Sequence, residues 1–287
     1  MIENKDRSRV SIVIPVYNEA AHLVACLDAI ADQSVRPYEV IVVDNNSTDD
    51  TAMIAAGYPF VRVLRQKRQG VVHARDKGFN AAQGDIIGRI DADTIISEDW
   101  VATLQRIFKD SAIGAVTGSA QYHDMGWAPL LNKVDLVIRR RLARAMKREV
   151  AIQGANMAIR SSVWQDIRRS LCRTGGMHED FDIAIHATDR GHLVIFDESL
   201  VVALGYRQAE SSFEDFVAYL MLNPHTYKIH GLKSYRHMYP VIYLAMAFYL
   251  LIKILHRGYD SGLQRFSWTK LLLAPAQQRV NPGTFVD

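Results

Sequence analysis

The sequence predicts an α/β fold in which a mostly parallel sheet is flanked by helices and followed by an apolar helical extension. Short β-branched runs without polar alternation recur in the first half, as expected of strands that are covered on both faces. Segments with apolar residues at helical spacing lie between these runs, which favours parallel strands joined by right-handed crossovers. Hydrophobic residues make up 49% of the 287 positions, enough to build a core between such layers.

The elements of the first half follow from these patterns. The apolar, β-branched runs give the expected strands, and the amphipathic runs between them give the helices, one of which ends near Ala55 and is capped by Ser47 or Asp49. We expect strands at Val10–Val16, Val40–Val43, Val61–Leu64 and Ile86–Ile90, and helices at Ala20–Asp32 and His73–Ala82.

The second half is less regular. We expect strands at Ala115–Tyr122 and Gly154–Ile159, helices at Pro129–Arg148 and Glu179–Arg190, and a helical, increasingly apolar chain from Ser212. A boundary near Gly231 divides the chain into a domain of residues 1–230 and an extension of residues 231–287.

Composition narrows the function classes. The charged fraction of 23% and the large apolar fraction exclude a disordered chain, and the net charge of +3 does not indicate a nucleic-acid partner. The two cysteines, Cys26 and Cys172, are too few for a disulfide framework and favour a reducing compartment. The polar start of the chain carries no secretory signal, so we expect a cytoplasmic location.

Polar clusters follow three of the predicted strands, at residues 17–19, 44–47 and 91–93. In an open α/β sheet the ligand crevice lies at the carboxyl ends of the strands, so these clusters are expected to share one rim. The alternative is that these Asp and Asn residues only form turns and cap helices.

The pair Asp91 and Asp93 has the spacing of a divalent-cation site. Residues two apart in a strand point the same way, so both carboxylates can face one ion. Oxygen-only ligands suit Mg²⁺ or Mn²⁺, which would neutralise charge on a leaving diphosphate.

Five motifs in order resemble the family 2 glycosyltransferases of the GT-A fold, over about residues 8–206. The resemblance implies inverting transfer of a sugar from a nucleotide-sugar donor. The motifs are residues 11–19 (SIVIPVYNE), 42–49 (VVDNNSTD), 70–78 (GVVHARDKG) and 90–93 (IDAD), followed by 154–158 (GANMA) with 178–180 (HED).

The resemblance implies a role for each matching residue. Asp93 is the main metal ligand and Asp91 lies near the ribose or diphosphate, while Gly154 and Asn156 belong to the acceptor side. Arg75 either steadies the donor or is an ordinary surface residue. The base and ribose are held by Pro15, Tyr17, Glu19, Asp44 and Asn46, with Asp44 accepting from a base N–H, so that a UDP-sugar is the first expectation and a GDP-sugar the second.

Inversion needs a base that removes the acceptor's hydroxyl proton, and Asp180 matches the family's base in the pair with Glu179. Adjacent carboxylates repel, which raises one pKa toward working pH. The alternative is that both acids only favour the helix dipole in a first turn. Residues 173–177 are interpreted as a mobile loop that closes over substrate.

The sequence departs from the family pattern after this pair. Residues 205–208 (GYRQ) lack the Gln-x-x-Arg-Trp motif of processive members, which favours one sugar per encounter. Gly205 stands where many relatives have a histidine, so a third metal ligand is unassigned. Arg207 contacts diphosphate or is a surface arginine.

Two segments indicate a membrane surface and a lipid-linked or glycan acceptor. The fifteen uncharged residues 238–252 span about 22 Å as a helix, against about 30 Å for a bilayer core, which favours a tail packed on the domain or an in-plane helix. The helix at 129–148 has a basic end, suited to the inner face of a bacterial membrane or to a lipid phosphate, although a solvated basic face is the alternative.

Other nucleotide-binding classes are excluded by their missing loops. The first loop, residues 15–19, is not the Gly-x-Gly-x-x-Gly of a dehydrogenase or the glycine-rich basic loop of a nucleotidyltransferase, and the chain lacks the P-loop motif. A glycosyltransferase-like domain that only binds a nucleotide sugar or scaffolds a membrane complex stays open as the non-enzyme alternative.

Overall fold

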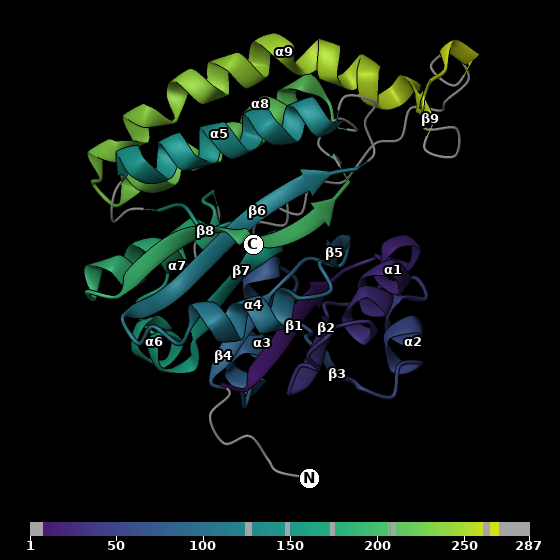
Figure 1. Cartoon of the computed structure of the whole chain (residues 1–287), viewed down its shortest axis with the longest axis vertical. Coiled ribbons are helices and arrows are strands. Elements are labelled where there is room, and N and C mark those ends of the chain that lie inside the picture. Colours follow the sequence, from purple (N-terminus) through teal and green to yellow (C-terminus); the bar gives the residue numbers. More distant parts are fainter. Residues whose placement is uncertain are drawn as a thin grey trace.

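The computed structural model describes residues 8–123, 128–146, 150–172, 176–205, 207, 211–260 and 265–269. An eight-stranded sheet forms its centre, in the order β3-β2-β1-β4-β7-β6-β8-β5 (Figure 1). The strands are β1 Val10–Val16, β2 Glu39–Asp44, β3 Val61–Arg65, β4 Ile86–Arg89, β5 Thr94–Ile96, β6 Ile113–Tyr122, β7 Met157–Arg160 and β8 Leu193–Leu204, with a separate pair β9 Tyr259–Asp260 and β10 Arg265–Phe266.

Helices cover both faces of this sheet and form a further layer above it. They are α1 Ala20–Ala31, α2 Thr51–Ala56, α3 Val71–Ala81, α4 Trp100–Ile107, α5 Ala128–Met146, α6 Ser161–Ile167, α7 Glu179–Asp189, α8 Phe213–Ile229 and α9 Tyr239–Gly258, with 3₁₀ turns η1 Gly154–Asn156 and η3 Lys233–His237.

The sheet is mixed rather than uniformly parallel. Strands β3, β2, β1 and β4 are parallel neighbours, as the alternating pattern of the first half predicts. Strand β7 runs antiparallel to β4 and β6, and β5 runs antiparallel to β8. The α/β class with flanking helices is therefore confirmed. Within the sheet, the antiparallel pairing arises where β7 lies between β4 and β6 and where β5 pairs with β8 at the edge.

Side chains on alternate positions of β1 enter two different cores. Ile12 and Ile14 pack in a cluster that includes α1 and α4, whereas Val13 packs in a cluster that includes α3, α6 and α7. All three are fully buried. This explains why the strand is apolar at every position except Ser11, since both faces are covered.

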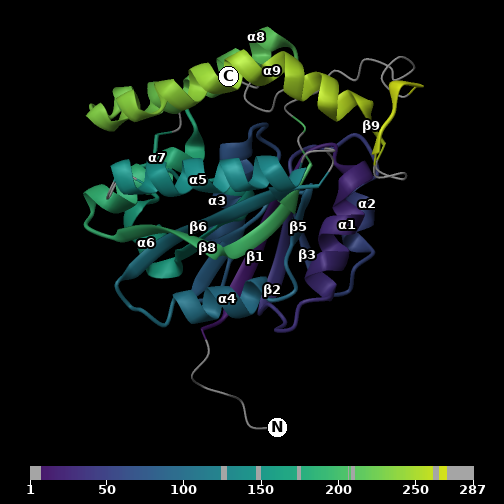
Figure 2. The ribbon, with the colours of Figure 1, turned by 45° about the horizontal axis from the view of Figure 1, so that its top comes forward.

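Helices α5, α8 and α9 lie together above the sheet (Figure 2), with α5 in direct contact with β6 and β8. Helix α7 packs between α8 and the same two strands. A third cluster joins this layer, with Met146 of α5, Ile185 of α7, Tyr227 of α8 and Ile242 of α9 buried in contact. The predicted boundary near Gly231 stays a prediction, and residues on both sides of it share this cluster.

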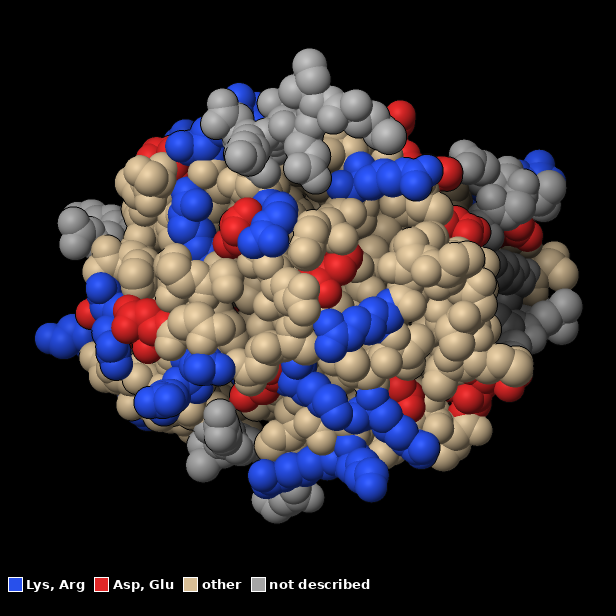
Figure 3. Space-filling model, turned by 90° about the horizontal axis from the view of Figure 1, so that it is seen from below, with Lys and Arg blue, Asp and Glu red and all other residues tan. Residues whose placement is uncertain are grey.

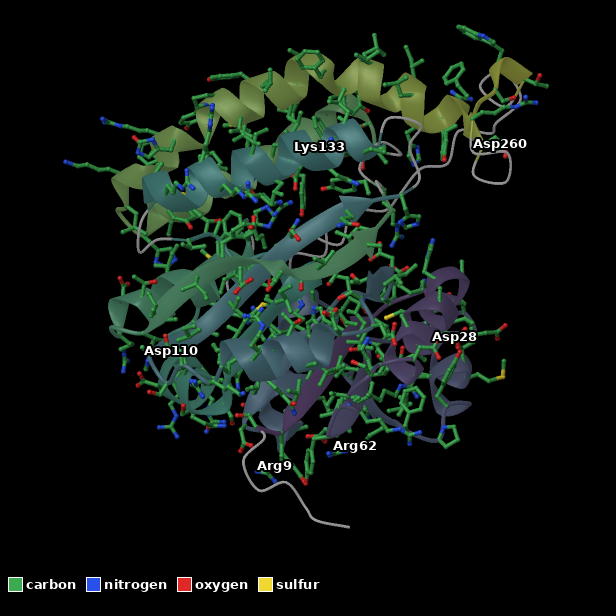
Figure 4. The ribbon with its side chains drawn as sticks, in the orientation of Figure 1. Arg9, Asp28, Arg62, Asp110, Lys133 and Asp260 are labelled. Atoms are coloured by element: carbon green, nitrogen blue, oxygen red, sulfur yellow. The ribbon has the colours of Figure 1, made fainter. Side chains whose placement is uncertain are left out.

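Two of the residues labelled in Figure 4 lie toward opposite ends of the molecule. Arg9 lies where the chain enters β1, at the bottom of Figure 4, and Lys133 lies on α5 in the upper layer. The face seen from below carries several groups of Lys and Arg with Asp and Glu between them (Figure 3).

Several predicted boundaries differ from the structure. The strand expected at Gly154–Ile159 begins only at Met157, because Gly154–Asn156 forms a 3₁₀ turn in which the Asn156 N–H donates to the carbonyl of Gln153. Asp50, not Ser47 or Asp49, is the N-cap residue of α2, although Asp49 accepts from the Thr51 N–H. Lys147, Arg148, residues 173–175, Tyr206 and Gln208 lie outside the described residues.

Candidate functional site

The polar segments after β1 and β2 bind each other directly. The Asn18 N–H donates to Ser47 Oγ at 3.1 Å, and Asn18 Oδ1 accepts from the Thr48 N–H at 2.8 Å. Asn18 has a φ of 53°, a left-handed conformation that asparagine adopts more readily than most residues. Pro15 and Tyr17, both partly buried, flank this segment in the sequence, and the first two of the three predicted polar clusters are thus in direct contact.

The segment after β2 organises a second loop. Asp44 is buried and accepts from the Ser47 N–H at 3.0 Å, and Asn46 donates to the Lys67 carbonyl at 2.7 Å. Asn45, to which the sequence analysis gave no role, donates to two carbonyls of residues 66–68 and accepts from the Gly70 N–H at 2.7 Å. The predicted donor-side residues thus lie together, and Asn45 fixes the loop that leads into α3.

Arg207 joins two acids from different strand ends. Its Nη1 donates to Asp93 Oδ2 at 2.8 Å and to Glu19 Oε1 at 2.9 Å, and Glu19 also lies 3.0 Å from His22 Nδ1. Burial raises the pKa of Glu19, but the bonds to His22 and Arg207 outweigh it and leave that pKa below its usual range. Arg207 is therefore an internal partner of the acidic rim and not an ordinary surface side chain.

Arg89 joins three further acids and is the residue that the sequence analysis missed. Only 4% of its side chain is exposed, and its guanidinium donates to Glu179 Oε1 at 3.1 Å, to Asp91 Oδ1 at 3.3 Å and to Asp180. The sequence did contain a signal for this residue. Arg89 ends an otherwise apolar, buried strand and stands two residues before Asp91. A buried cation there requires carboxylate partners.

The two adjacent acids of α7 have opposite pKa shifts. Burial, with the charges of Glu179 and Asp91, raises the pKa of Asp180 to about 7 against the lowering effect of Arg89. Burial also acts on Glu179, but Arg89 and Arg75 outweigh it and lower the pKa of that carboxyl. Such a divergence within one pair is typical of an acid–base site.

Gly154 is required by close approach to this pair. Its N–H donates to Asp180 Oδ2 at 2.8 Å, and a Cβ there would lie 2.4 Å from that oxygen and 2.6 Å from Arg89 Cζ. Asn156 is fully buried, accepts from Trp100 Nε1 and donates both amide hydrogens to the carbonyls of Ser119 and Leu200. Its predicted contact with the acceptor stays a prediction, and in this conformation its amide fixes the turn that holds Gly154.

Arg75 is completely buried, so its interpretation as a surface residue is wrong. Its guanidinium donates to Asp76 and, at 3.0 Å, to the carbonyl of Glu179, and it lies over the Trp164 ring. It therefore holds the first turn of α7, and contact with a donor stays a prediction.

Comparison with known proteins follows this geometry. The family model described as glycosyl transferase family 2 matches residues 11–175. The chain belongs to glycosyl transferase family 2. The predicted family is therefore confirmed.

Relatives of known sequence agree with this assignment. The chain is 26% identical over 202 residues to the glycosyltransferase AglE of Haloferax volcanii, covering 67% of this chain and 65% of that protein. It is 32% identical over 120 residues to the glycosyltransferase GlyG of Streptococcus pneumoniae, covering 40% of each. The chain thus spans less than two thirds of the length of either relative.

Solved structures confirm the GT-A fold. The mannosyltransferase PcManGT from Pyrobaculum calidifontis, in complex with GDP-Man and Mn²⁺, has a TM-score of 0.62 at 22% identity, covering 96% of this chain and 77% of that one. The glucosyl-3-phosphoglycerate synthase from Mycobacterium tuberculosis, in complex with Mn²⁺, UDP and glucosyl-3-phosphoglycerate, has a TM-score of 0.57 at 21% identity, covering 78% and 81%.

The acids of this family 2 chain fit a divalent cation. Asp93 already binds a positive charge, the guanidinium of Arg207, and Asp91 has 43% of its side chain exposed for a further ligand. Carboxylates with an open side suit Mg²⁺ or Mn²⁺, which keep part of their coordination for water and phosphate.

Proposed function

We propose that this chain transfers a sugar from a nucleoside diphosphate to an acceptor hydroxyl, inverting the anomeric carbon and adding one sugar per encounter. The observation that carries the proposal is the bridge made by Arg89, whose guanidinium contacts Asp91 on the donor side and Asp180 on α7. Asp180 and Asp91 are therefore separated only by the guanidinium of Arg89. An inverting displacement needs its base near the leaving diphosphate but on the opposite face of the anomeric carbon, and this separation is compatible with that role.

The proposed reaction divides between two groups of residues. Asp180 takes the proton of the acceptor hydroxyl as that oxygen bonds to the anomeric carbon, and the bond from that carbon to the diphosphate breaks. Its pKa of about 7 suits a base at neutral pH. Asp93 and Asp91 would hold Mg²⁺ or Mn²⁺, which supplies positive charge for the departing diphosphate.

The donor is proposed to bind at the rim formed by the segments after β1 and β2. Pro15, Tyr17, Glu19, Asp44 and Asn46 lie there, where the two polar segments are bonded to each other. A uridine or a guanosine donor is expected, since the structural relatives named above carry UDP and GDP-Man. Arg75 of α3 holds the first turn of α7, which carries Glu179 and Asp180, and Gly154 borders Asp180 on the proposed acceptor side.

A membrane surface is the proposed location of the acceptor, on the evidence of α9. Lys233–Gly258 is a segment of 26 residues whose most apolar 18-residue stretch has a mean hydropathy of 1.9 and is 18% buried, so by length and composition it is able to cross a membrane. One face of α9 nevertheless packs on the protein. Ile242 and Tyr249 are buried there, and Lys253 Nζ donates to the Ser211 carbonyl at 2.9 Å.

The opposite face of α9 is apolar and open. Five of its large side chains, between 40% and 66% exposed, are Leu244, Phe248, Leu250, Leu251 and Ile254. A helix with one docked and one apolar face suits a position in the plane of a membrane, and we propose peripheral binding to the inner face of the cytoplasmic membrane and a lipid-linked or cell-envelope glycan acceptor. The basic end of α5 contributes less than its sequence indicates, because Arg139 and Arg140 are paired with Asp135 and Glu198.

Calorimetry with a panel of UDP- and GDP-sugars, with and without Mn²⁺, tests the donor site. We expect Mn²⁺-dependent binding of one nucleotide sugar, weakened in Asp93→Ala and retained in Asp180→Asn, whereas Asp180→Asn abolishes release of nucleoside diphosphate in the presence of acceptor. Glu98→Gln, at an exposed carboxylate, serves as the matched control for both.

Two outcomes would contradict the proposal. A folded chain that binds no nucleotide sugar has no donor site, and a chain that binds donor without metal-dependent release of nucleoside diphosphate is a scaffold. Failure to bind anionic vesicles at low salt, together with use of soluble acceptors alone, would contradict the membrane assignment while leaving the transfer reaction intact.

A further inference from the structure

Four potential metal ligands converge below the C-terminal layer, outside the site described above. Cys172 follows α6, Asp182 and His186 lie one turn apart on α7, and His230 caps the end of α8. One ligand atom from each residue lies within 4.8 Å of all the others. Three segments separated along the chain thus bring sulfur, nitrogen and oxygen donors to one point.

Hydrogen bonding within the protein does not account for this arrangement. Asp182 is 1% exposed, and its Oδ2 accepts from the Cys172 N–H at 2.9 Å. Its Oδ1 lies 3.3 Å from His186 Nε2 and 3.0 Å from His230 Nε2, yet these three buried atoms have no hydrogen-bond partner of acceptable geometry among the described residues. Buried polar atoms that lack partners are costly, and they commonly mark a missing ion or water.

We propose that Cys172, Asp182, His186 and His230 bind one Zn²⁺ ion. Zinc takes sulfur, nitrogen and carboxylate ligands in tetrahedral sites, with bonds of about 2.0–2.3 Å that place neighbouring ligand atoms about 3.3–3.8 Å apart. The ligand atoms, between 3.0 Å and 4.8 Å apart, reach this geometry by small shifts of the side chains. Hard cations such as Mg²⁺ prefer oxygen ligands, so this site selects a different ion from the one proposed for Asp91 and Asp93.

Charge balance supports a divalent ion with this ligand set. A thiolate and a carboxylate together neutralise Zn²⁺, and two neutral imidazoles complete four coordination without adding charge. Without an ion, the buried carboxylate of Asp182 has the imidazole groups of His186 and His230 as its neighbours. A cluster held by hydrogen bonds from these imidazoles is the competing arrangement, and it predicts no affinity for zinc.

A closed, four-ligand site is structural, since it keeps no position for substrate. The ion would fasten the end of α8 and the segment at Cys172 to α7, whose first turn carries Glu179 and Asp180. A hydrogen bond of 2.9 Å from the His178 N–H to Thr226 Oγ1 of α8 already runs between these elements. The inference therefore concerns the positioning of α7 and does not depend on which sugar is transferred.

Cobalt spectroscopy on the full chain tests the proposal without any activity measurement. After a chelator has removed any metal, the chain is expected to bind one Co²⁺ and to show the visible bands of tetrahedral cobalt together with a thiolate-to-cobalt charge-transfer band. One equivalent of Zn²⁺ should remove both kinds of band, and excess Mg²⁺ should leave them unchanged. Zn²⁺ should also raise the melting temperature. A wild-type chain that binds neither ion would overturn the proposal.

The two cysteines of the chain supply a matched pair of variants. Cys172→Ser is expected to lose the charge-transfer band, whereas Cys26→Ser keeps it. Cys26 lies beside Asp91, with its Sγ 3.7 Å from the Asp91 carbonyl, so the reverse result would place the cobalt at the donor-side acids and refute the site. If Cys172→Ser fails to fold, the variant His230→Gln provides a second test. It should weaken Zn²⁺ binding at least about 100-fold. An unchanged affinity for Zn²⁺ would contradict the assignment.

Discussion

Replacement of Arg89 by methionine removes the cation that three carboxylates share. Glu179 and Asp180 each have 14% of their side chains exposed, so removal of Arg89 leaves two mostly buried acids without their main counter-charge. Breaking a buried ion pair from one side costs about 3–5 kcal/mol. Because a whole domain is stable by about 5–15 kcal/mol, we expect a folded but marginal variant.

The loss should depend on pH with a definite sign. Arg89 lowers the pKa of Asp180, which stands at about 7, so its removal raises that pKa further. Above this value Asp180 is charged and the missing cation costs most; as the pH falls toward about 6, Asp180 takes up a proton and the cost shrinks. Urea unfolding of both chains at several pH values between about 6 and 8 measures the difference.

Arg160→Met is the matched control. Its guanidinium is partly buried, and among the described residues its hydrogen bonds go to the carbonyls of Ile113, Phe108 and Asp110 and to no carboxylate. Its loss of stability should therefore be the same at every pH. A pH-independent loss in Arg89→Met, or one below about 1 kcal/mol, would refute the view that Arg89 neutralises the acids of α7.

Three further predictions concern activity and the membrane. Gly154→Ala should cost about 1–3 kcal/mol of stability, because its Cβ overlaps Asp180 and Arg89, and should lower kcat while donor affinity by calorimetry is kept; unchanged kcat would contradict the close approach. Transfer by the wild-type chain should rise with pH through about 7 as Asp180 loses its proton, and a flat kcat/KM profile would exclude Asp180 as the base. The double variant Leu250→Glu, Leu251→Glu should reduce sedimentation with anionic vesicles at least tenfold at unchanged melting temperature, because both side chains are at least half exposed; undiminished binding would remove α9 from the interface.

The first half of the fold could be predicted closely from local pattern. Strands β1 to β4 and helices α1 and α3 lie within two residues of their expected bounds, because each carries apolar residues whose spacing is visible in a short window. Strand β5, helices α4 and α6 and the long strand β8 were not predicted. Strand β8 carries Asp197, Glu198 and Ser199 between two short apolar runs, residues 193–196 and 200–204, so no single apolar run marks its whole length.

The predicted site residues are partly brought together by the fold. Glu19 and Asp93 meet through Arg207, which lies 188 and 114 residues from them along the chain. Asp91 and Asp180 meet through Arg89, which lies 2 and 91 residues from them. Such pairings leave no periodic trace in a sequence. Arg89 was therefore missed, and Arg207 was left between two interpretations.

The sequence by itself determined the α/β class, the family and the identity of the acids at the strand ends, because apolar periodicity and short motifs are local properties. Tertiary structure decided which charges face each other: that Arg75 is buried under α7, that Gly154 must lack a side chain beside Asp180, and that Cys172, Asp182, His186 and His230 meet. The physical reason is that burial and long-range charge pairing exist only once distant segments pack, and they fix both the pKa of Asp180 and the cost of any unpaired group around it.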